Sequence, residues 1–268
     1  MIGGFFLLLQ NSFEQFRANS KTVLIFALLL VFVPIFSIFQ NIYISSGSVF
    51  LDYNLLLSSP LLLFGEIALL LLFLVFYSFF ASIVIFGVRK NLSSVRLQFY
   101  LHEMLQKFTL RIFVFFALYC LLLFLLTLFL LSLGMPIALA AIPLLLVSFV
   151  LQFVPQAVVV DEEGLRHALL SNFDFLAQQP VVFLKVAVIG AVLLALVQLL
   201  EFALIQVTML APYISLLLVL VLVQPFIEIM KTYQYMMRFE LIKEHEAVLR
   251  KKPHYFRPAP LSLAEAKP

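Results

Sequence analysis

The chain consists of long apolar runs that alternate with short polar segments. A helix that crosses a membrane needs about 20 apolar residues, and six runs are long enough. Two of them come from one uncharged stretch, residues 112–160, which Gly134 and Pro136 divide because these residue types together mark a tight turn. We therefore predict six transmembrane helices, over residues 22–44, 61–88, 111–132, 136–160, 181–206 and 211–230.

More polar segments precede the first, third and fifth of these runs and resemble one another. Residues 11–20 align without a gap on residues 171–180, and residues 97–108 form a looser copy. Each segment is too polar to span a membrane, but its pattern is amphipathic, which is typical of a helix that lies flat in the interface. We predict such interfacial helices over residues 4–19, 92–108 and 162–179, and hence three repeats of an interfacial helix followed by a transmembrane hairpin.

The third interfacial segment has the clearest predicted boundaries. Asp161 is a suitable N-cap, and acidic residues 162 and 163 suit a first helical turn because they interact favourably with the helix dipole. Pro180 can begin the following span. The predicted apolar face consists of Leu165, Leu169, Phe173 and Leu176.

Composition supports the same class. Hydrophobic residues make up 64% of the 268 residues and charged residues 12%, with a mean hydropathy of +1.14. A water-soluble domain holds about 25% charged residues, so a soluble fold is excluded. We predict an all-α integral membrane bundle of six transmembrane helices over residues 1–240, followed by a partly disordered cytoplasmic tail, 241–268.

The basic residues predict the orientation. The net charge is +3, and all 17 Lys and Arg residues fall in segments on one side of the predicted topology. The loops on the other side, at about 45–60, 132–136 and 207–212, contain none. Positive residues favour the cytoplasmic side, so we predict a protein of the cell membrane with both termini in the cytoplasm. Positive charge placed in this way indicates membrane topology and not nucleic-acid binding.

Charged residues inside the spans are candidates for function, because burying a charge in a membrane is costly. Glu66 and Glu201 are predicted to lie toward the outer leaflet, where no basic residue can pair with them, and Gln198 is placed on the same face as Glu201. These carboxyl groups would face outer water, stay protonated or bind a cation. They form a candidate polar membrane site, and whether the two glutamates share a cavity is left open.

Two further charges are predicted near the inner side. Lys185, at the start of span five, and Glu228, at the end of span six, are candidates for a structural ion pair. The four histidines lack metal-ligand spacing, and no phosphate loop, nucleophile elbow or paired catalytic carboxylates occur. The sequence therefore predicts no catalytic residues, no metal and no cofactor.

Short motifs follow the fourth span in a fixed order. They are Phe153-Val-Pro155, Ala157-Val-Val-Val-Asp-Glu-Glu-Gly164, Ala168-Leu-Leu-Ser171, Gln179-Pro180 and, after the last span, Tyr235-Met-Met-Arg238. This order resembles the membrane domain of the glycerophosphoryl diester phosphodiesterase family and its uncharacterised prokaryotic relatives, over most of residues 5–240. The resemblance implies a six-helix membrane module that is sometimes fused to a phosphodiesterase domain. The present chain carries the membrane module only, so no activity is implied.

Two functions are consistent with these features. The first is a non-enzymatic membrane module that binds or organises lipids or a membrane partner, which the interfacial repeats favour. The alternative is a transporter or permease subunit, with the outer glutamates near the substrate path and the interfacial helices docked on a cytoplasmic ATPase.

Overall fold

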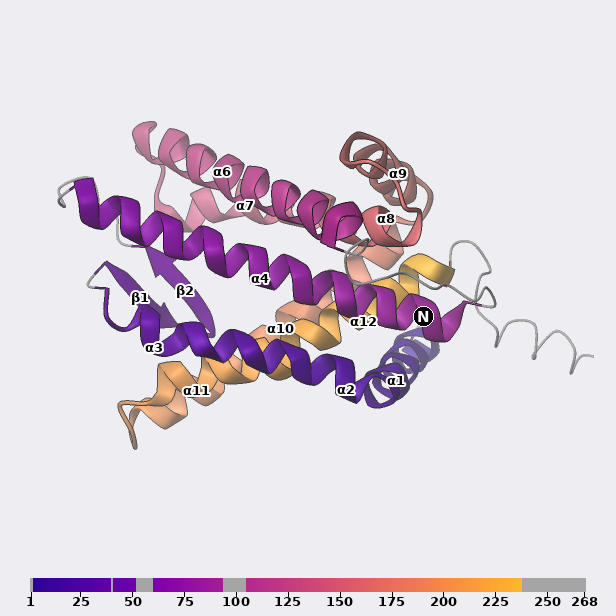
Figure 1. Ribbon diagram of the computed structural model, residues 1–268, viewed down its shortest axis with the longest axis horizontal. Coiled ribbons are helices and arrows are strands. Elements are labelled where there is room, and N and C mark those ends of the chain that lie inside the picture. Colours follow the sequence, from indigo (N-terminus) through magenta and orange to yellow (C-terminus); the bar gives the residue numbers. More distant parts are fainter. Residues whose placement is uncertain (1, 40, 52–59, 94–104, 238–268) are drawn as a thin grey trace, which may run out of the picture.

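The computed structural model describes residues 2–39, 41–51, 60–93 and 105–237. It is a helical bundle, with one small β hairpin at one end (Figure 1). In this part of the chain, five helices are long and apolar enough to cross a membrane, or six if one bent helix pair counts as a span. The protein is therefore a multi-pass helical membrane protein, as the hydrophobic pattern predicts.

The five long spans match the predicted ranges to within four residues at most ends, but the third span begins at Leu105 instead of 111 and the last ends at Met237 instead of 230. They comprise Leu61–Leu92, Leu105–Ser132, Leu139–Val160, Pro180–Ile205 and Ala211–Met237. Their elements are α4 (Pro60–Leu92), η3 (Leu105–Thr109), α6 (Leu110–Ser132), α7 (Ile137–Leu151), α8 (Val154–Val160), α10 (Pro180–Ile205), α11 (Ala211–Leu218), η4 (Val219–Val223) and α12 (Gln224–Met237). Many large apolar side chains on these helices are exposed, as expected of a surface that faces lipid.

The first predicted span has a different form. Helix α1 (Ile2–Ala18) meets a second helical run at a bend of 78°, and that run consists of α2 (Ser20–Val23), the 3₁₀ helix η1 (Leu24–Val31) and α3 (Phe32–Phe36). A 3₁₀ helix rises about 2.0 Å per residue instead of about 1.5 Å, so a short run still reaches far across the bilayer.

The prediction that this span continues to residue 44 is wrong. Strands β1 (Ile42–Ser45) and β2 (Ser48–Leu51) form an antiparallel hairpin in which Ser45 pairs with Ser48. Ser46 and Gly47, at the turn, have φ values of 51° and 70°. Positive φ at both central residues matches the right-handed twist of a two-residue hairpin turn, so the chain reverses here instead of continuing a helix.

The two ends of the bundle differ in charge. We call the end that contains the β hairpin, the α6–α7 turn and the α10–α11 turn the hairpin end; these segments contain no Lys or Arg. The opposite end, where α1 and α9 (Leu165–Gln178) lie, we call the basic end (Figure 1). Of the predicted interfacial segments, two are helices, α1 and α9. The 92–108 segment falls mostly outside the described residues, as does the tail, 241–268, and residues 105–108 belong to the third long span instead of an interfacial helix.

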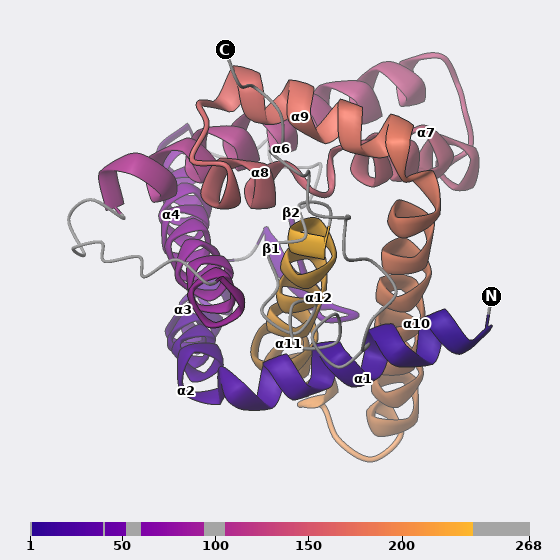
Figure 2. The same ribbon diagram turned by 90° about the vertical axis from the view of Figure 1, so that its right-hand side faces the viewer.

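Helix α12 occupies the centre of the bundle and packs against α4, α1, α8 and α10 (Figure 2). Four large aromatic side chains join it to α8, α9 and α10: Tyr235, Phe153, Phe175 and Phe183, each fully or almost fully buried. Ring pairs of this kind stabilise a structure beyond their buried area. This cluster holds the basic end of α12 in place.

The predicted start of α9 is incorrect. The helix begins at Leu165 after Gly164, and Asp161 instead ends α8 and accepts a hydrogen bond from the Tyr235 hydroxyl. The face of α9 turned toward the core is centred on Ala168, Asn172 and Phe175, while Phe173 is exposed. Leu165, Leu169 and Leu176 do pack against the core, so the predicted face is displaced by part of a turn.

Candidate functional site

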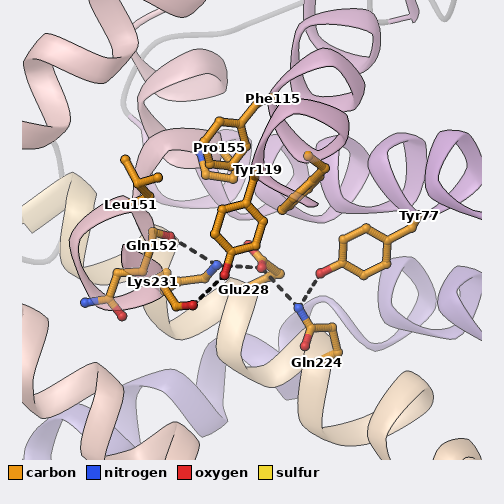
Figure 3. Close-up of a pocket in the computed structure, with 11 residues that line it drawn as sticks. Tyr77, Phe115, Tyr119, Leu151, Gln152, Pro155, Gln224, Glu228 and Lys231 are labelled. Carbon is orange, nitrogen blue, oxygen red and sulfur yellow. Dashed lines mark hydrogen bonds and ion pairs between the residues drawn. The ribbon is translucent and has the colours of Figure 1, made fainter. Parts of the chain in front are cut away.

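A polar pocket lies inside the bundle, where α4, α6, α7, α8 and α12 meet (Figure 3). Its volume is about 180 Å³. It is lined by Tyr77, Phe115, Phe116, Tyr119, Ser148, Leu151, Gln152, Pro155, Gln224, Glu228 and Lys231. A polar cavity among otherwise apolar helices is costly to form, so it is the first candidate for a binding site.

Helix α12 supplies the charged side chains of this pocket. Gln224, Glu228 and Lys231 lie at spacings of four and three residues and therefore share one helical face. The turn just before them, η4, is a π-helix, and Pro225 follows it. Such irregular turns inside long helices often occur at functional sites.

Glu228 and Lys231 form a buried ion pair, with 2.6 Å between Oε1 and Nζ. Glu228 is 1% exposed. Its Oε1 also accepts a hydrogen bond from Gln224 at 3.4 Å, and its Oε2 accepts one from Gln156 at 2.7 Å. Lys231 additionally donates to the backbone carbonyl of Gln152 at 3.3 Å. The pair is therefore neutral as a whole, and its carboxylate is well satisfied.

Two tyrosines complete the polar lining. The Gln224 amide donates to the Tyr77 hydroxyl. The Tyr119 hydroxyl lies 2.6 Å from Ser148 Oγ, and Ser148 itself donates to the Leu144 carbonyl, so Tyr119 is the donor of that pair. Tyr77 and Gln224 lie on one side of the pocket, and Lys231 and Gln152 on the other (Figure 3).

A larger, mainly apolar cavity adjoins the pocket. Its volume is about 500 Å³. Tyr77 and Gln224, which are hydrogen-bonded to each other, line both cavities and so lie between the polar pocket and the apolar cavity. The other lining residues of the apolar cavity are Gly47, Ser48, Val49, Ile67, Leu70, Leu71, Phe73, Leu74, Ala117, Cys120, Leu216, Val219 and Leu220. We refer to the two cavities together as the chamber.

The β hairpin covers the chamber from the hairpin end. The backbone N–H of Gly47 donates to Ser215 Oγ at 3.1 Å. A Cβ atom at Gly47 would lie 2.3 Å from Val219 Cγ2, so only glycine fits this close approach. The hairpin is therefore fixed against α11 and η4.

The predicted outer glutamates hold this hairpin. Glu66 is 1% exposed and accepts hydrogen bonds from the Asn41 amide at 3.1 and 3.3 Å. Glu201 is 4% exposed and accepts from Ser45 at 3.4 Å and from Ser215. Both carboxyl groups lie at the hairpin end, but they accept hydrogen bonds from different residues. Neither of them lines either cavity of the chamber.

Gln198 lies apart from this arrangement. It is exposed on α10, while Glu201 is buried. The spacing of three residues therefore does not place the two side chains in one site.

The predicted pair of Lys185 with Glu228 is corrected by the structure. Glu228 pairs with Lys231, one turn away on its own helix, because α12 continues helically to Met237 and brings this lysine inside. Lys185 is half-buried on α10 and belongs to no ion pair within the described ranges. The sequence did not point to Lys231 as an intramembrane charge, because the predicted span six ends at residue 230.

A second charged cluster surrounds Glu162 at the basic end. Arg89 donates to Glu162 at 3.0 Å, and Lys107 forms the second ion pair. Partial burial would raise the pKa of Glu162, but hydrogen bonds and charge from Lys107 and Arg89 outweigh it, and the net effect lowers this pKa. Arg111 donates to the Glu163 carbonyl at 2.9 Å. The acidic turn between α8 and α9 thus joins α4 and α6 electrostatically.

No metal site is evident in the part of the chain that the structure describes, because no group of three His, Cys, Asp or Glu side chains lies together there. Comparison with known proteins gives no match to a family model, to a curated protein or to a solved structure. The function is therefore inferred from the chamber alone.

Proposed function

We propose that this membrane protein binds an amphiphilic, lipid-like molecule in the chamber, in a non-enzymatic role. The observation that carries the proposal is the junction at Tyr77 and Gln224, where an apolar cavity of about 500 Å³ meets a polar pocket of about 180 Å³. Small-molecule sites commonly have volumes of about 300–1,000 Å³, with apolar walls and a few polar groups that fix orientation. The chamber has this composition.

The direction of the ligand follows from the lining. Its apolar chain would lie between α4 and the α11–η4 segment, toward Val49 and Gly47 of the hairpin. Its polar head would lie beyond Tyr77, near Glu228 and Lys231. Burying the alkyl chain against leucine and phenylalanine side chains favours binding. Hydrogen bonds to the pocket compensate for those that the head group loses when it leaves the membrane surface.

A cavity-filling substitution tests the proposal. Ala117 lines the apolar cavity, whereas Leu118, the next residue on α6, is 55% exposed on the outer surface. Ala117→Phe should fill the cavity, and Leu118→Phe is the matched control. We expect native mass spectrometry to show a retained amphiphile on the wild type and on Leu118→Phe, but not on Ala117→Phe. Equal retention by all three proteins would contradict the proposal.

We also propose that the basic end faces the cytoplasm, because all segments rich in Lys and Arg lie there. Single cysteines at Ser46, Gly134 and Thr208, in a Cys120→Ser background, should react with a membrane-impermeant reagent from outside only. Labelling from the cytoplasmic side alone would show that the protein has the opposite orientation.

A further inference from the structure

We infer that the chamber takes an amphiphile whose head group is uncharged and accepts hydrogen bonds, such as a carbonyl or a hydroxyl group. This inference rests on the proposed function and specifies its ligand class. It depends on two features of the polar pocket: which donors remain open, and what net charge the pocket carries.

The open donors belong to Tyr77 and Lys231. Tyr77 accepts from Gln224, but no described residue accepts the proton of Tyr77 itself. Lys231 uses two of its three N–H donors, on Glu228 and on the Gln152 carbonyl. Tyr119, by contrast, already donates to Ser148. Unused donors in a buried pocket favour a ligand that brings an acceptor.

The acceptors of the pocket are more fully used. The Glu228 carboxylate already accepts from Lys231, Gln224 and Gln156. The Gln224 carbonyl oxygen accepts from no described residue, so a ligand hydroxyl can donate there while it accepts from Tyr77. A hydroxyl and a carbonyl both satisfy this arrangement, whereas a head that only donates leaves Tyr77 unused.

The net charge of the pocket disfavours an ionic head. Among the described residues that line the two cavities, the charged ones are Glu228 and Lys231, which neutralise each other. A carboxylate or phosphate head would compete with Glu228 for Lys231, and an ammonium head would compete with Lys231 for Glu228. Either would leave one uncompensated buried charge, which is strongly unfavourable.

The single cysteine of the chain provides a direct readout, because Cys120 lines the apolar cavity and is exposed enough for a thiol reagent to reach it. The rate at which a small thiol reagent alkylates Cys120 should fall when the chamber is occupied. We would compare a methyl ketone, a primary alcohol, a carboxylate and a primary amine that carry the same alkyl chain. The ketone and the alcohol should protect Cys120 at concentrations at least about tenfold lower than the two ionic compounds.

Two variants of the polar pocket and one control variant test the role of the head group. Tyr77→Phe removes the open donor and should weaken protection by the ketone several-fold, while Tyr213→Phe, on α11 and outside both cavities, should leave it unchanged. Glu228→Gln gives the pocket a net positive charge, so the carboxylate should then protect better than it does in the wild type, once folding of the variant is verified by its melting transition.

The outcomes distinguish the two proposals. Equal or better protection of the wild type by the carboxylate or the amine would overturn the inference about the head group but leave amphiphile binding standing. Protection by none of the four compounds, together with no retained ligand on the wild type, would overturn both.

Discussion

The carboxyl groups at the two ends of the bundle are satisfied in different ways. At the hairpin end, Glu66 and Glu201 receive hydrogen bonds from neutral side chains, Asn41, Ser45 and Ser215. Toward the basic end, Glu162 and Glu228 are bound by cations. The difference follows from the sequence, which places no Lys or Arg in the segments of the hairpin end. Neutral donors suffice there because the hairpin and the residue before it bring Ser45 and Asn41 to the carboxyl groups, and α11 brings Ser215.

The same difference between the two ends explains why the polar pocket of the chamber lies away from the hairpin. A neutral ion pair can be kept inside the bundle only where helices supply both charges and several amide donors. Helix α12 supplies both charges and one amide, Gln224, within two turns, and α8 supplies the second amide, Gln156. The hairpin end instead contributes small groups that close the apolar cavity, including Gly47 and Ser48.

The largest expected effect comes from separating the buried ion pair. Lys231→Met should destabilise the protein by about 3–5 kcal/mol, because Glu228 would remain buried without its cation. The double variant Lys231→Met/Glu228→Gln should recover most of this loss. Chemical unfolding in mixed micelles would measure both. If Lys231→Met lowers the free energy of unfolding no more than Glu66→Gln does, the contrast between the two ends is wrong.

The next effect concerns the fixed hairpin. Gly47→Ala should cost about 2–4 kcal/mol, since it combines a strained positive φ with a clash against Val219. Gly134 has a similar φ of 72° but open space around it, so Gly134→Ala should cost about 1 kcal/mol. Gly164→Ala, with neither problem, serves as the control. Equal unfolding curves for the first two variants would show that the hairpin does not pack tightly on η4.

Acid should selectively weaken the cluster at Glu162. Its folded-state pKa is lowered, so its contribution is fully present above the unfolded pKa of about 4.3 and is lost as the pH falls through the folded value. With the Glu162 side chain 26% exposed, we expect about 1 kcal/mol. Melting temperatures of the wild type should therefore fall more steeply than those of Glu162→Gln as the pH drops below about 4.3. Parallel curves would remove Glu162 from the acid response.

The smallest expected effect is at the outer glutamates. Gln preserves the shape and keeps one acceptor oxygen, so each side chain retains a hydrogen bond from a neutral donor, and Glu66→Gln and Glu201→Gln should each change stability by no more than about 0.5 kcal/mol. Thermal unfolding would test this. A loss above about 3 kcal/mol in either variant would mean that an ionised carboxylate with a bound cation is required, which would favour the acidic transport site considered from the sequence.

The sequence predicted the spans well, because long apolar runs and positive loops are direct consequences of the bilayer. It failed at Ile42–Leu51, where apolar content suggested the end of a helix. The signal of a hairpin is the Ser45-Ser-Gly-Ser48 turn between two short runs of β-branched and aromatic residues, and these runs also continue the apolar pattern of the preceding span.

The site was only partly predictable. Glu228 is recognisable in the sequence as an intramembrane charge, but the predicted partner, Lys185, lies on another helix. The spacing of three residues between Glu228 and Lys231 indicates a pair within α12. The contribution of Tyr77 and Gln152 depends on how α4, α7 and α12 pack, which one-dimensional spacing does not contain. The start of α9 was missed because Asp161 bonds to Tyr235, which is distant in sequence.

The central claim is that the chamber holds an amphiphile, and photo-crosslinking tests it most directly. A long-chain ketone with a diazirine in its alkyl chain would be activated in membranes, and the modified residues of α4 would be mapped by peptide sequencing. Leu70, Phe73 and Leu74 line the chamber, whereas Leu72 and Phe76 on the same helix are 49% and 41% exposed on the outer surface. We expect labelling of the first group, reduced by Ala117→Phe. Labelling confined to Leu72 and Phe76 would show that the ketone binds only as surrounding lipid and would contradict the account.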